Sequence, residues 1–170
     1  PLEEKEKAHL VRTLGTKSRI LAVGTDRGLL VSTDRGGSWK RLNFGKTNDL
    51  DHLGDHLFVA SEKTLQASRD LGLTWIDLTR NIGGRQVISL ACGQTGKDMV
   101  LHALLEDKDT LLTSRDWGKS WVSNQVGGKP SRSASTIDMA ANQTGTLFIN
   151  RNEELWRSMD FGKSWKRSIY

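Results

Sequence analysis

The chain has 170 residues, of which 36% are hydrophobic and 26% are charged, and its formal net charge is +5 with a pI near 9.5. This length is sufficient to bury a core without stabilising disulfides, and the sequence has no run of eighteen apolar residues that would form a membrane-spanning helix. The positive excess favours anionic partners, but basic and acidic residues alternate along most of the chain, so nucleic acid is not favoured. Residues 1–7 are charged and lack the apolar segment of a signal peptide, which predicts a cytoplasmic or virion-associated protein.

Four short β-like segments recur in each of four successive stretches of the chain. Apolar and polar residues alternate in them with the period of two that is typical of half-buried strands. In chain order the expected strands are 9–14, 19–24, 28–31 and 39–42; 50–53, 56–60, 64–67 and 75–78; 87–92, 99–105, 110–113 and 121–124; and 136–141, 145–150, 154–157 and 165–168.

The turn between the third and fourth strand of each stretch carries one pattern, Ser-x-Asp-x-Gly-x-(Ser/Thr)-Trp. Its four copies start 36, 46 and 44 residues apart, and a period of this size predicts one supersecondary unit stacked on copies of itself. The defining residues are Ser32, Asp34, Gly36 and Trp39; Ser68, Asp70, Gly72 and Trp75; Ser114, Asp116, Gly118 and Trp121; and Ser158, Asp160, Gly162 and Trp165.

The pattern predicts an all-β fold, a β-propeller of four four-stranded antiparallel blades. We expect residues 1–170 to form one propeller domain with blades at about 8–43, 48–79, 86–125 and 136–170. The two prolines, Pro1 and Pro130, lie outside the expected strands, as sheet pairing requires.

Each repeated residue has a structural role in such a turn. The Asp accepts backbone N–H groups, the Gly supplies a positive φ, the hydroxyl residues add bonds within the loop, and the Trp is expected to wedge against a neighbouring hairpin or blade. We therefore interpret the boxes as elements of the fold and expect no catalytic residue among them.

This pattern resembles the Asp-box, or bacterial neuraminidase repeat, of sialidases, some endoglucanases, sortilin-type receptors and photosystem II assembly-factor-like proteins. The Gly-Lys-Ser-Trp version in the third and fourth units, with Trp156 before the last box, is most similar to the assembly-factor-like group. The resemblance covers about residues 8–170 and implies a propeller, while a fold of this kind leaves the function open.

Families with these boxes usually have six or seven blades, whereas this chain has four. The chain could close alone as a four-bladed ring or pair with a second copy into an eight-bladed ring. An open half-ring is the least favoured arrangement, because it would expose two apolar blade faces.

A glycosidase is the enzymatic alternative that the resemblance raises. A sialidase would imply an arginine triad, an early Arg-Ile-Pro segment and a Tyr nucleophile, but the chain lacks Arg-Ile-Pro and its one tyrosine is the terminal Tyr170. A glycosidase with two carboxylates remains possible in principle, yet no pair of acidic residues stands out.

Other reactive groups are few. The segment 48–56 holds two histidines and three acids, but on a strand Asp49 and Asp51 share one face while His52 takes the other, so a polar hairpin is expected and no metal or other cofactor. The single cysteine, Cys92, is expected to be a buried structural thiol.

The connections between blades carry basic residues and no acids within 43–48, 79–86 and 124–135. We expect them to form a positive collar on the propeller face opposite the boxes, a surface that would attract an acidic protein. The alternative is that they only keep the loops soluble. The collar residues are Lys46, Arg80, Arg85, Lys129 and Arg132.

These observations favour a non-catalytic protein-interaction or assembly module, such as a structural component of a phage tail or virion. The alternative is a propeller that binds or hydrolyses acidic carbohydrate. The expected partners are a protein with an acidic surface, a larger assembly or a second copy of the chain.

Overall fold

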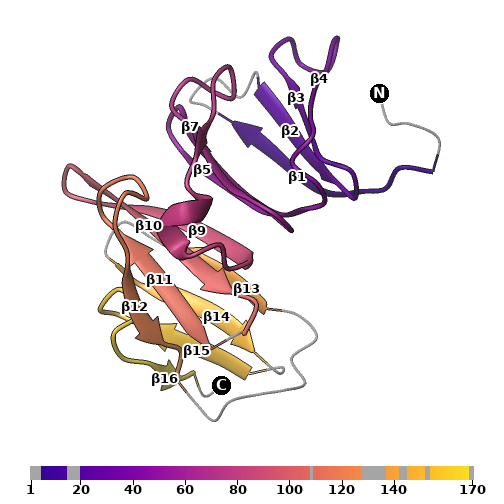
Figure 1. Cartoon of the computed structure of the whole chain (residues 1–170). Helices are drawn as coiled ribbons and strands as arrows, with labels where there is room; N and C mark the ends of the chain where they lie inside the picture. Colours follow the sequence, from indigo (N-terminus) through magenta and orange to yellow (C-terminus); the bar gives the residue numbers. More distant parts are fainter. Residues whose placement is uncertain are drawn as a thin grey trace. The chain divides into compact units, whose positions relative to one another are not determined.

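The computed structural model describes residues 5–14, 20–107, 109–127, 137–141, 145–151 and 154–168. Its strands form four antiparallel four-stranded sheets, and within each sheet the strands are neighbours in chain order (Figure 1). The sequence-based expectation of an all-β fold with four blades is thus confirmed. Among the described residues, no helix is long and apolar enough to cross a membrane.

The chain divides into two compact units, Pro1–Val87 and Ile88–Tyr170, and each contains two blades. The strands of the first unit are β1 (Ala8–Leu14), β2 (Ile20–Thr25), β3 (Leu29–Ser32) and β4 (Lys40–Leu42) in the first blade, and β5 (Thr47–Leu53), β6 (His56–Ser61), β7 (Leu65–Ser68) and β8 (Ile76–Asp77) in the second.

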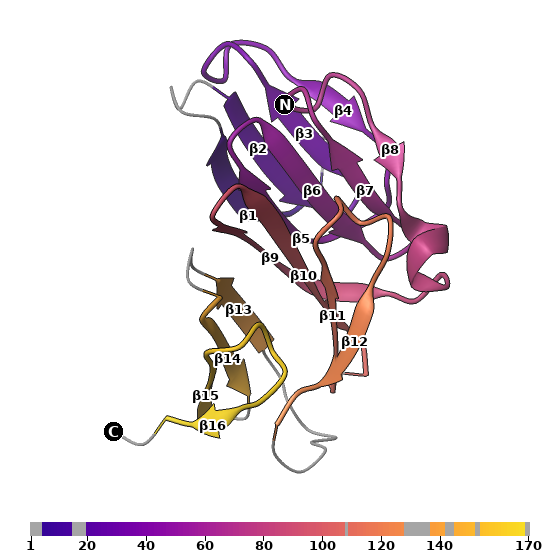
Figure 2. The same ribbon diagram turned by 90° about the vertical axis from the view of Figure 1, so that its left-hand side faces the viewer.

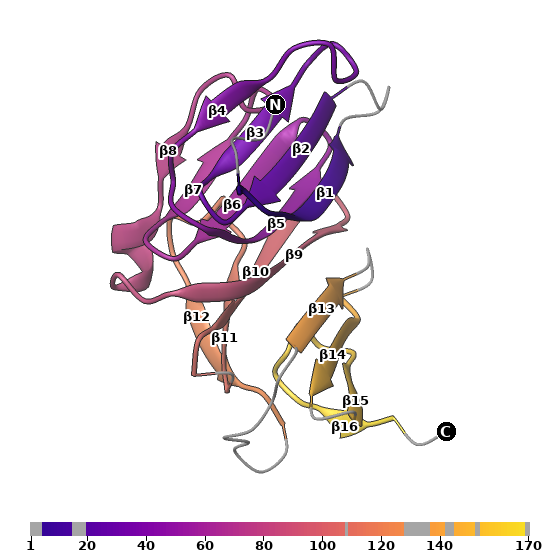
Figure 3. The same cartoon turned by 90° about the vertical axis from the view of Figure 1, so that its right-hand side faces the viewer.

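The second unit repeats this plan, and Figure 3 shows the strands of its last blade in chain order. Its strands are β9 (Val87–Thr95), β10 (Asp98–Leu105), β11 (Thr110–Ser114) and β12 (Val122–Gln125) in the third blade, and β13 (Ile137–Ala141), β14 (Leu147–Arg151), β15 (Glu154–Ser158) and β16 (Lys166–Arg167) in the fourth.

All sixteen expected strands are present, and the differences lie at their ends. The fourth strand of each blade begins after the box Trp and not at it, as at Lys40, because the Trp indole is bonded back into the turn. A short 3₁₀ helix, η1 (Thr79–Ile82), was not expected in the connection after β8. The Asp77 carboxylate accepts a bond from the Thr79 N–H at 2.8 Å, and Gly83 ends the helix in a left-handed conformation.

The core of the first unit lies between its two blades, which stand next to each other in Figure 2. Buried side chains of the first blade, among them Leu29 and Val31, pack with Leu57 and Val59 of the second. Trp75 packs against the same cluster, and its ring meets Phe44 edge-on at 5.2 Å between centroids. The expected wedge role of the box Trp is therefore confirmed here.

The core of the second unit is built in the same way. Leu104 and Leu111 of the third blade are fully buried with Leu147 and Ile149 of the fourth, and Trp165 packs against them. The prediction that residues 1–170 form one domain, and the closure of a ring, stay predictions.

Candidate binding site

The four boxes share one hydrogen-bond network. In each box one oxygen of the Asp carboxylate accepts the backbone N–H of the residue four positions later at 2.7–2.9 Å. The other oxygen accepts the hydroxyl of that same residue at 2.6–2.7 Å. The first Ser donates its hydroxyl to the Asp at 2.7–2.8 Å and accepts the N–H of the box Gly at 2.7–2.9 Å.

These bonds stabilise the ionised form of the carboxylate. They lower the pKa of Asp34, Asp70, Asp116 and Asp160 to about 2, and the largest cause in each is the hydroxyl bond from the Ser or Thr four residues later. A group held in this way is a poor proton donor near neutral pH. The box aspartates therefore have the geometry of turn stabilisers.

The box also contains a strained position that sequence reasoning did not find. The residue before the Gly has a positive φ in all four boxes, and it is Arg35 (62°), Leu71 (57°), Trp117 (65°) or Phe161 (61°). Non-glycine residues adopt this conformation at a cost. In the second and fourth blades its N–H donates to the turn between that blade's first two strands, from Leu71 to the Asp55 carbonyl at 3.1 Å and from Phe161 to the Gly145 carbonyl at 3.2 Å.

Three of the five expected collar residues are described, and all three are exposed. Lys46 ends the connection between β4 and β5, Arg80 lies in η1, and Arg85 follows it and donates its Nε to the Ile82 carbonyl at 3.2 Å. Lys129 and Arg132 lie outside the described residues. The collar as a binding surface remains a prediction.

Acidic residues that sequence reasoning overlooked share this end of the first unit. The Glu62 N–H donates to the Lys46 carbonyl at 3.0 Å. Asp77 lies close enough to Arg80 for the cation to contribute to the lowered pKa of its carboxyl, although hydrogen bonds from Thr79 are the larger cause. The turns between the second and third strands reach the same end as the connections between blades, so acids in these turns lie near the collar residues.

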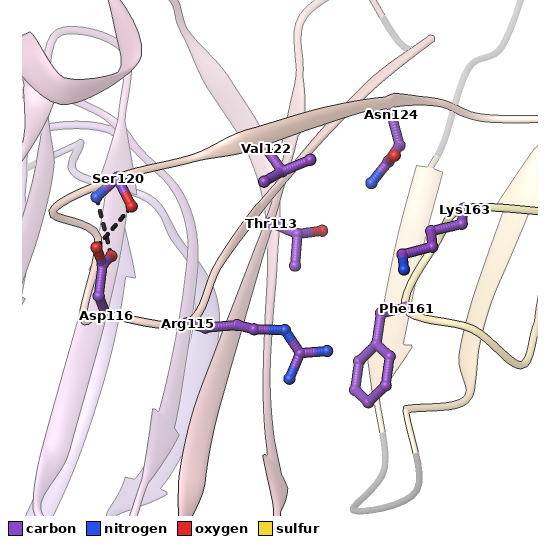
Figure 4. A pocket seen from close by; sticks show the side chains of 8 residues that line it. All are labelled: Thr113, Arg115, Asp116, Ser120, Val122, Asn124, Phe161 and Lys163. Carbon is purple, nitrogen blue, oxygen red and sulfur yellow. Dashed lines mark hydrogen bonds between the residues drawn. The ribbon is translucent and has the colours of Figure 1, made fainter.

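A cavity of about 500 Å³ opens within the second unit, between the β11–β12 hairpin and the box of the fourth blade (Figure 4). Its lining combines two cations, one aromatic ring, one carboxylate and several small polar groups. The lining residues are Thr113, Arg115, Asp116, Ser120, Val122, Asn124, Phe161 and Lys163.

The Phe161 ring contacts two other side chains at this cavity, Arg115 and His102. The Arg115 guanidinium carbon lies 4.2 Å from the centroid of the Phe161 ring, within the range of a cation–π contact. The buried His102 imidazole is stacked on the same ring at 6.5 Å, and its Nδ1 lies 3.0 Å from the Thr113 hydroxyl oxygen. Burial, with a smaller contribution from the Arg115 charge, lowers the pKa of His102 to about 4, so the imidazole is neutral near pH 7.

The first unit has apolar residues at several of the corresponding positions, although Lys40 is the counterpart of Val122. The strand registers align Ala22 and Val31 with His102 and Thr113, and Leu42 with Asn124. The box position of Phe161 is Leu71 in the second blade, and Leu42 and Leu71 both pack against the first unit's core. The polar cavity of the second unit thus results from a few substitutions in a common frame.

The other candidate groups identified from sequence are not assembled into a reactive site. Within the described part of the chain, no three metal-ligating side chains converge. The Asp49 carboxylate accepts the Leu50 N–H at 2.7 Å and lies 4.0 Å from Arg12. The expectation that Cys92 is buried was wrong: it is half-buried, because its neighbour Ala91 takes the core position.

Comparisons with known proteins support the same fold. The BNR-Asp box repeat family matches residues 155–169. Sortilin of Danio rerio is 29% identical over 113 residues, which are 62% of this chain and 14% of that protein. The chain therefore spans a small part of this curated relative.

Two solved structures extend the comparison to most of the chain. An ancestral GH74 enzyme superposes with a TM-score of 0.73 at 16% identity, over 96% of this chain and 24% of its own. YCF48 bound to D1 peptide superposes with a TM-score of 0.55 at 17% identity, over 87% of this chain and 50% of its own. This chain therefore has a β-propeller fold that carries Asp-box repeats, as its four boxes had indicated.

Proposed function

We propose that this chain is a non-catalytic binding module that recognises an acidic protein partner. The observation that carries the proposal is the state of the carboxylates at the candidate site. Asp116 is the one acid among the residues that line the cavity, and its two oxygens already accept bonds from Ser114 and Ser120. Hydrolysis of a glycosidic bond by the usual mechanism needs a second carboxylate roughly 5–9.5 Å from the first.

The exposed cations of the first unit support the choice of an acidic partner. Lys46 and Arg85 lie in the connections between blades and Arg80 lies in η1, and all three side chains are exposed. Arrays of like charge on a rigid scaffold accelerate association with an oppositely charged surface.

In this proposal the four blades form one propeller domain, and the chain is a structural or assembly component of a larger particle. A phage tail or virion, or an assembly in the cytoplasm, would provide such a setting. Two of the known structures illustrate the alternatives: YCF48 holds a peptide, and the GH74 protein is an enzyme. A propeller that binds or cleaves acidic glycans is therefore the competing function.

Charge reversal tests the proposal on the purified chain. Binding to an immobilised poly-glutamate peptide is measured for the triple variant Lys46→Glu, Arg80→Glu and Arg85→Glu, with Lys40→Glu, Lys166→Glu and Lys7→Glu as a control of equal charge change. We expect the first variant to lose most of the binding and the control to retain most of it. Equal losses in both would mean that net charge alone acts, and a positive glycan array or hydrolysis screen would support the competing function.

A further inference from the structure

We infer that the cavity of the second unit is a specific site for the carboxylate of an acidic peptide segment. This site is separate from the collar and shares no residue with it. Its members are Arg115, Lys163 and Asn124, which approach the cavity from two blades, and the apolar walls Phe161 and Val122 (Figure 4).

The charge balance of the cavity favours an anion. Arg115 and Lys163 are both exposed box residues, and in the described part of the chain neither forms an ion pair. The one acid, Asp116, is directed into its own turn by bonds of 2.9 Å and 2.6 Å from Ser120. Two positive charges therefore face a cavity whose single negative charge is already bonded.

The geometry of Arg115 favours a planar anion. Its guanidinium carbon lies 4.2 Å from the centroid of the Phe161 ring, a cation–π contact that restricts the side chain. A guanidinium edge matches the two oxygens of a carboxylate, and such charge-assisted pairs are stronger than neutral hydrogen bonds. Asn124 and Lys163 point toward the same space and can bond the same group (Figure 4).

The remaining lining favours a peptide over a sugar acid. The Thr113 hydroxyl oxygen lies 3.0 Å from His102, and the Ser120 hydroxyl donates to Asp116, so the hydroxyls of the site already have partners. Val122 is 64% exposed and Phe161 is half-buried, and both offer apolar surface. The lining thus offers few free hydrogen-bonding groups to a sugar ring, whereas an acidic residue next to an apolar one would match both the cations and the apolar walls.

The test uses two fluorescein-labelled nonapeptides that differ only in a central Glu-Phe or Gln-Phe pair, measured by fluorescence anisotropy. Full-length variants Arg115→Gln and Lys163→Gln are compared with Arg69→Gln and Lys119→Gln, which change the corresponding positions of neighbouring boxes. We expect the Glu peptide to bind at least about tenfold more tightly than the Gln peptide, and Arg115→Gln to remove most of this difference. Both controls should retain it.

A second variant keeps the test valid if Arg115→Gln disturbs folding. Asn124→Leu introduces the residue of the first blade at this position and fills part of the cavity without changing its charge, so it should also weaken binding. Equal affinity for the two peptides, unchanged binding in Arg115→Gln, or tighter binding of glucuronate than of the Glu peptide would overturn the inference. Because the collar is intact in these variants, such a result would leave the proposed function standing.

Discussion

The two units share one plan, yet they use the space between their blades differently. In the first unit Val31, Leu42 and Leu71 close the interface with apolar packing. In the second unit Thr113, Asn124 and Phe161 occupy these positions, and a cavity remains beside Arg115. The comparison shows that the box fixes the blades, while the residues beside it decide whether an interface is a core or a site.

A second difference concerns the residue two positions after the box Trp. Arg41 makes two bonds of 2.7 Å to the buried Glu6 carboxylate, which also accepts the Thr25 hydroxyl at 2.6 Å. Arg167 is its counterpart in the fourth blade, and it meets Glu154 at 3.1 Å with 60% of its side chain exposed. The position two residues after the box Trp thus forms a buried ion pair in the first unit and an exposed ion pair in the second.

The largest expected effect comes from breaking the buried ion pair between Glu6 and Arg41. Glu6→Gln leaves a partly buried guanidinium without its counter-charge, which should lower the free energy of unfolding by about 3–5 kcal/mol. Glu154→Gln removes an exposed pair and should cost about 0–1 kcal/mol. Urea denaturation of both variants checks the difference, and equal losses would show that the buried pair has no special role.

The next effect tests the packing around the box Gly. At Gly162, with φ of +81°, an added Cβ would collide with the Leu111 side chain of the third blade. At Gly72, with φ of +88°, the nearest atom would be Cζ2 of Trp75 at 3.3 Å. We expect Gly162→Ala to cost about 3 kcal/mol from backbone strain and overpacking, and Gly72→Ala about 1–2 kcal/mol from strain alone.

Thermal unfolding of these two variants provides the measurement. If Gly72→Ala proved the more damaging, the close approach of the Leu111 side chain to Gly162 would not be what sets the cost of these substitutions.

A third effect is a pH dependence of the folding stability, which His102 gives to the second unit. His102 has a pKa of about 4 in the folded chain against 6.5 for the free side chain, so the unfolded state binds the proton more readily. Stability from this residue is therefore present above pH 6.5 and is lost as the pH falls toward 4, by an amount of about 3 kcal/mol. The first unit has Ala22 at this position and lacks this dependence.

This pH dependence is measured from melting temperatures between pH 7 and 4. The native chain is compared with His102→Gln and with the control His56→Gln. The melting temperature should depend less steeply on pH only in His102→Gln. The box aspartates act in a lower window, because their pKa values of about 2 make their stabilisation present above pH 4 and lost only as the pH falls through about 2. A slope that persists in His102→Gln would contradict the assignment to this residue.

The smallest effect is expected from substitutions that give the blade interface of one unit the residue found in the other unit. Asn124→Leu should increase the free energy of unfolding by about 1 kcal/mol, because it adds apolar burial at a half-buried position. The reverse change in the first unit, Leu42→Asn, should lower it by a similar or larger amount, since Leu42 packs against the core. Calorimetry on the pair checks both signs, and a loss of stability in Asn124→Leu would mean that its amide has a structural partner.

Much of the fold could be predicted from local chemistry. The bonds of Ser32, Asp34 and Ser38 form within eight residues, so the turn follows from the sequence of the turn itself. The alternation of apolar and polar residues on either side of the turns then predicted the strands. The helix η1 was missed because it depends on one carboxylate bond from Asp77 within a loop that has no helical period.

The candidate site was only partly foreseen. The collar residues were found because they share a charge and a place in the connections. Arg115 and Phe161 were passed over, since each is a variable position of a repeated turn and they are 46 residues apart. A comparison of the four repeats would not have singled out Arg115 and Lys163, because Arg69 and Lys119 occupy the same positions in other boxes.

The sequence by itself determined the four hairpin turns, the strand order and the blade as a unit, because their defining bonds join residues close along the chain. Only the tertiary structure decided which variable side chains meet between blades and that Glu6 is buried with Arg41. Those contacts join residues far apart in the sequence, and their strength depends on burial, which the packing of one blade on the next creates.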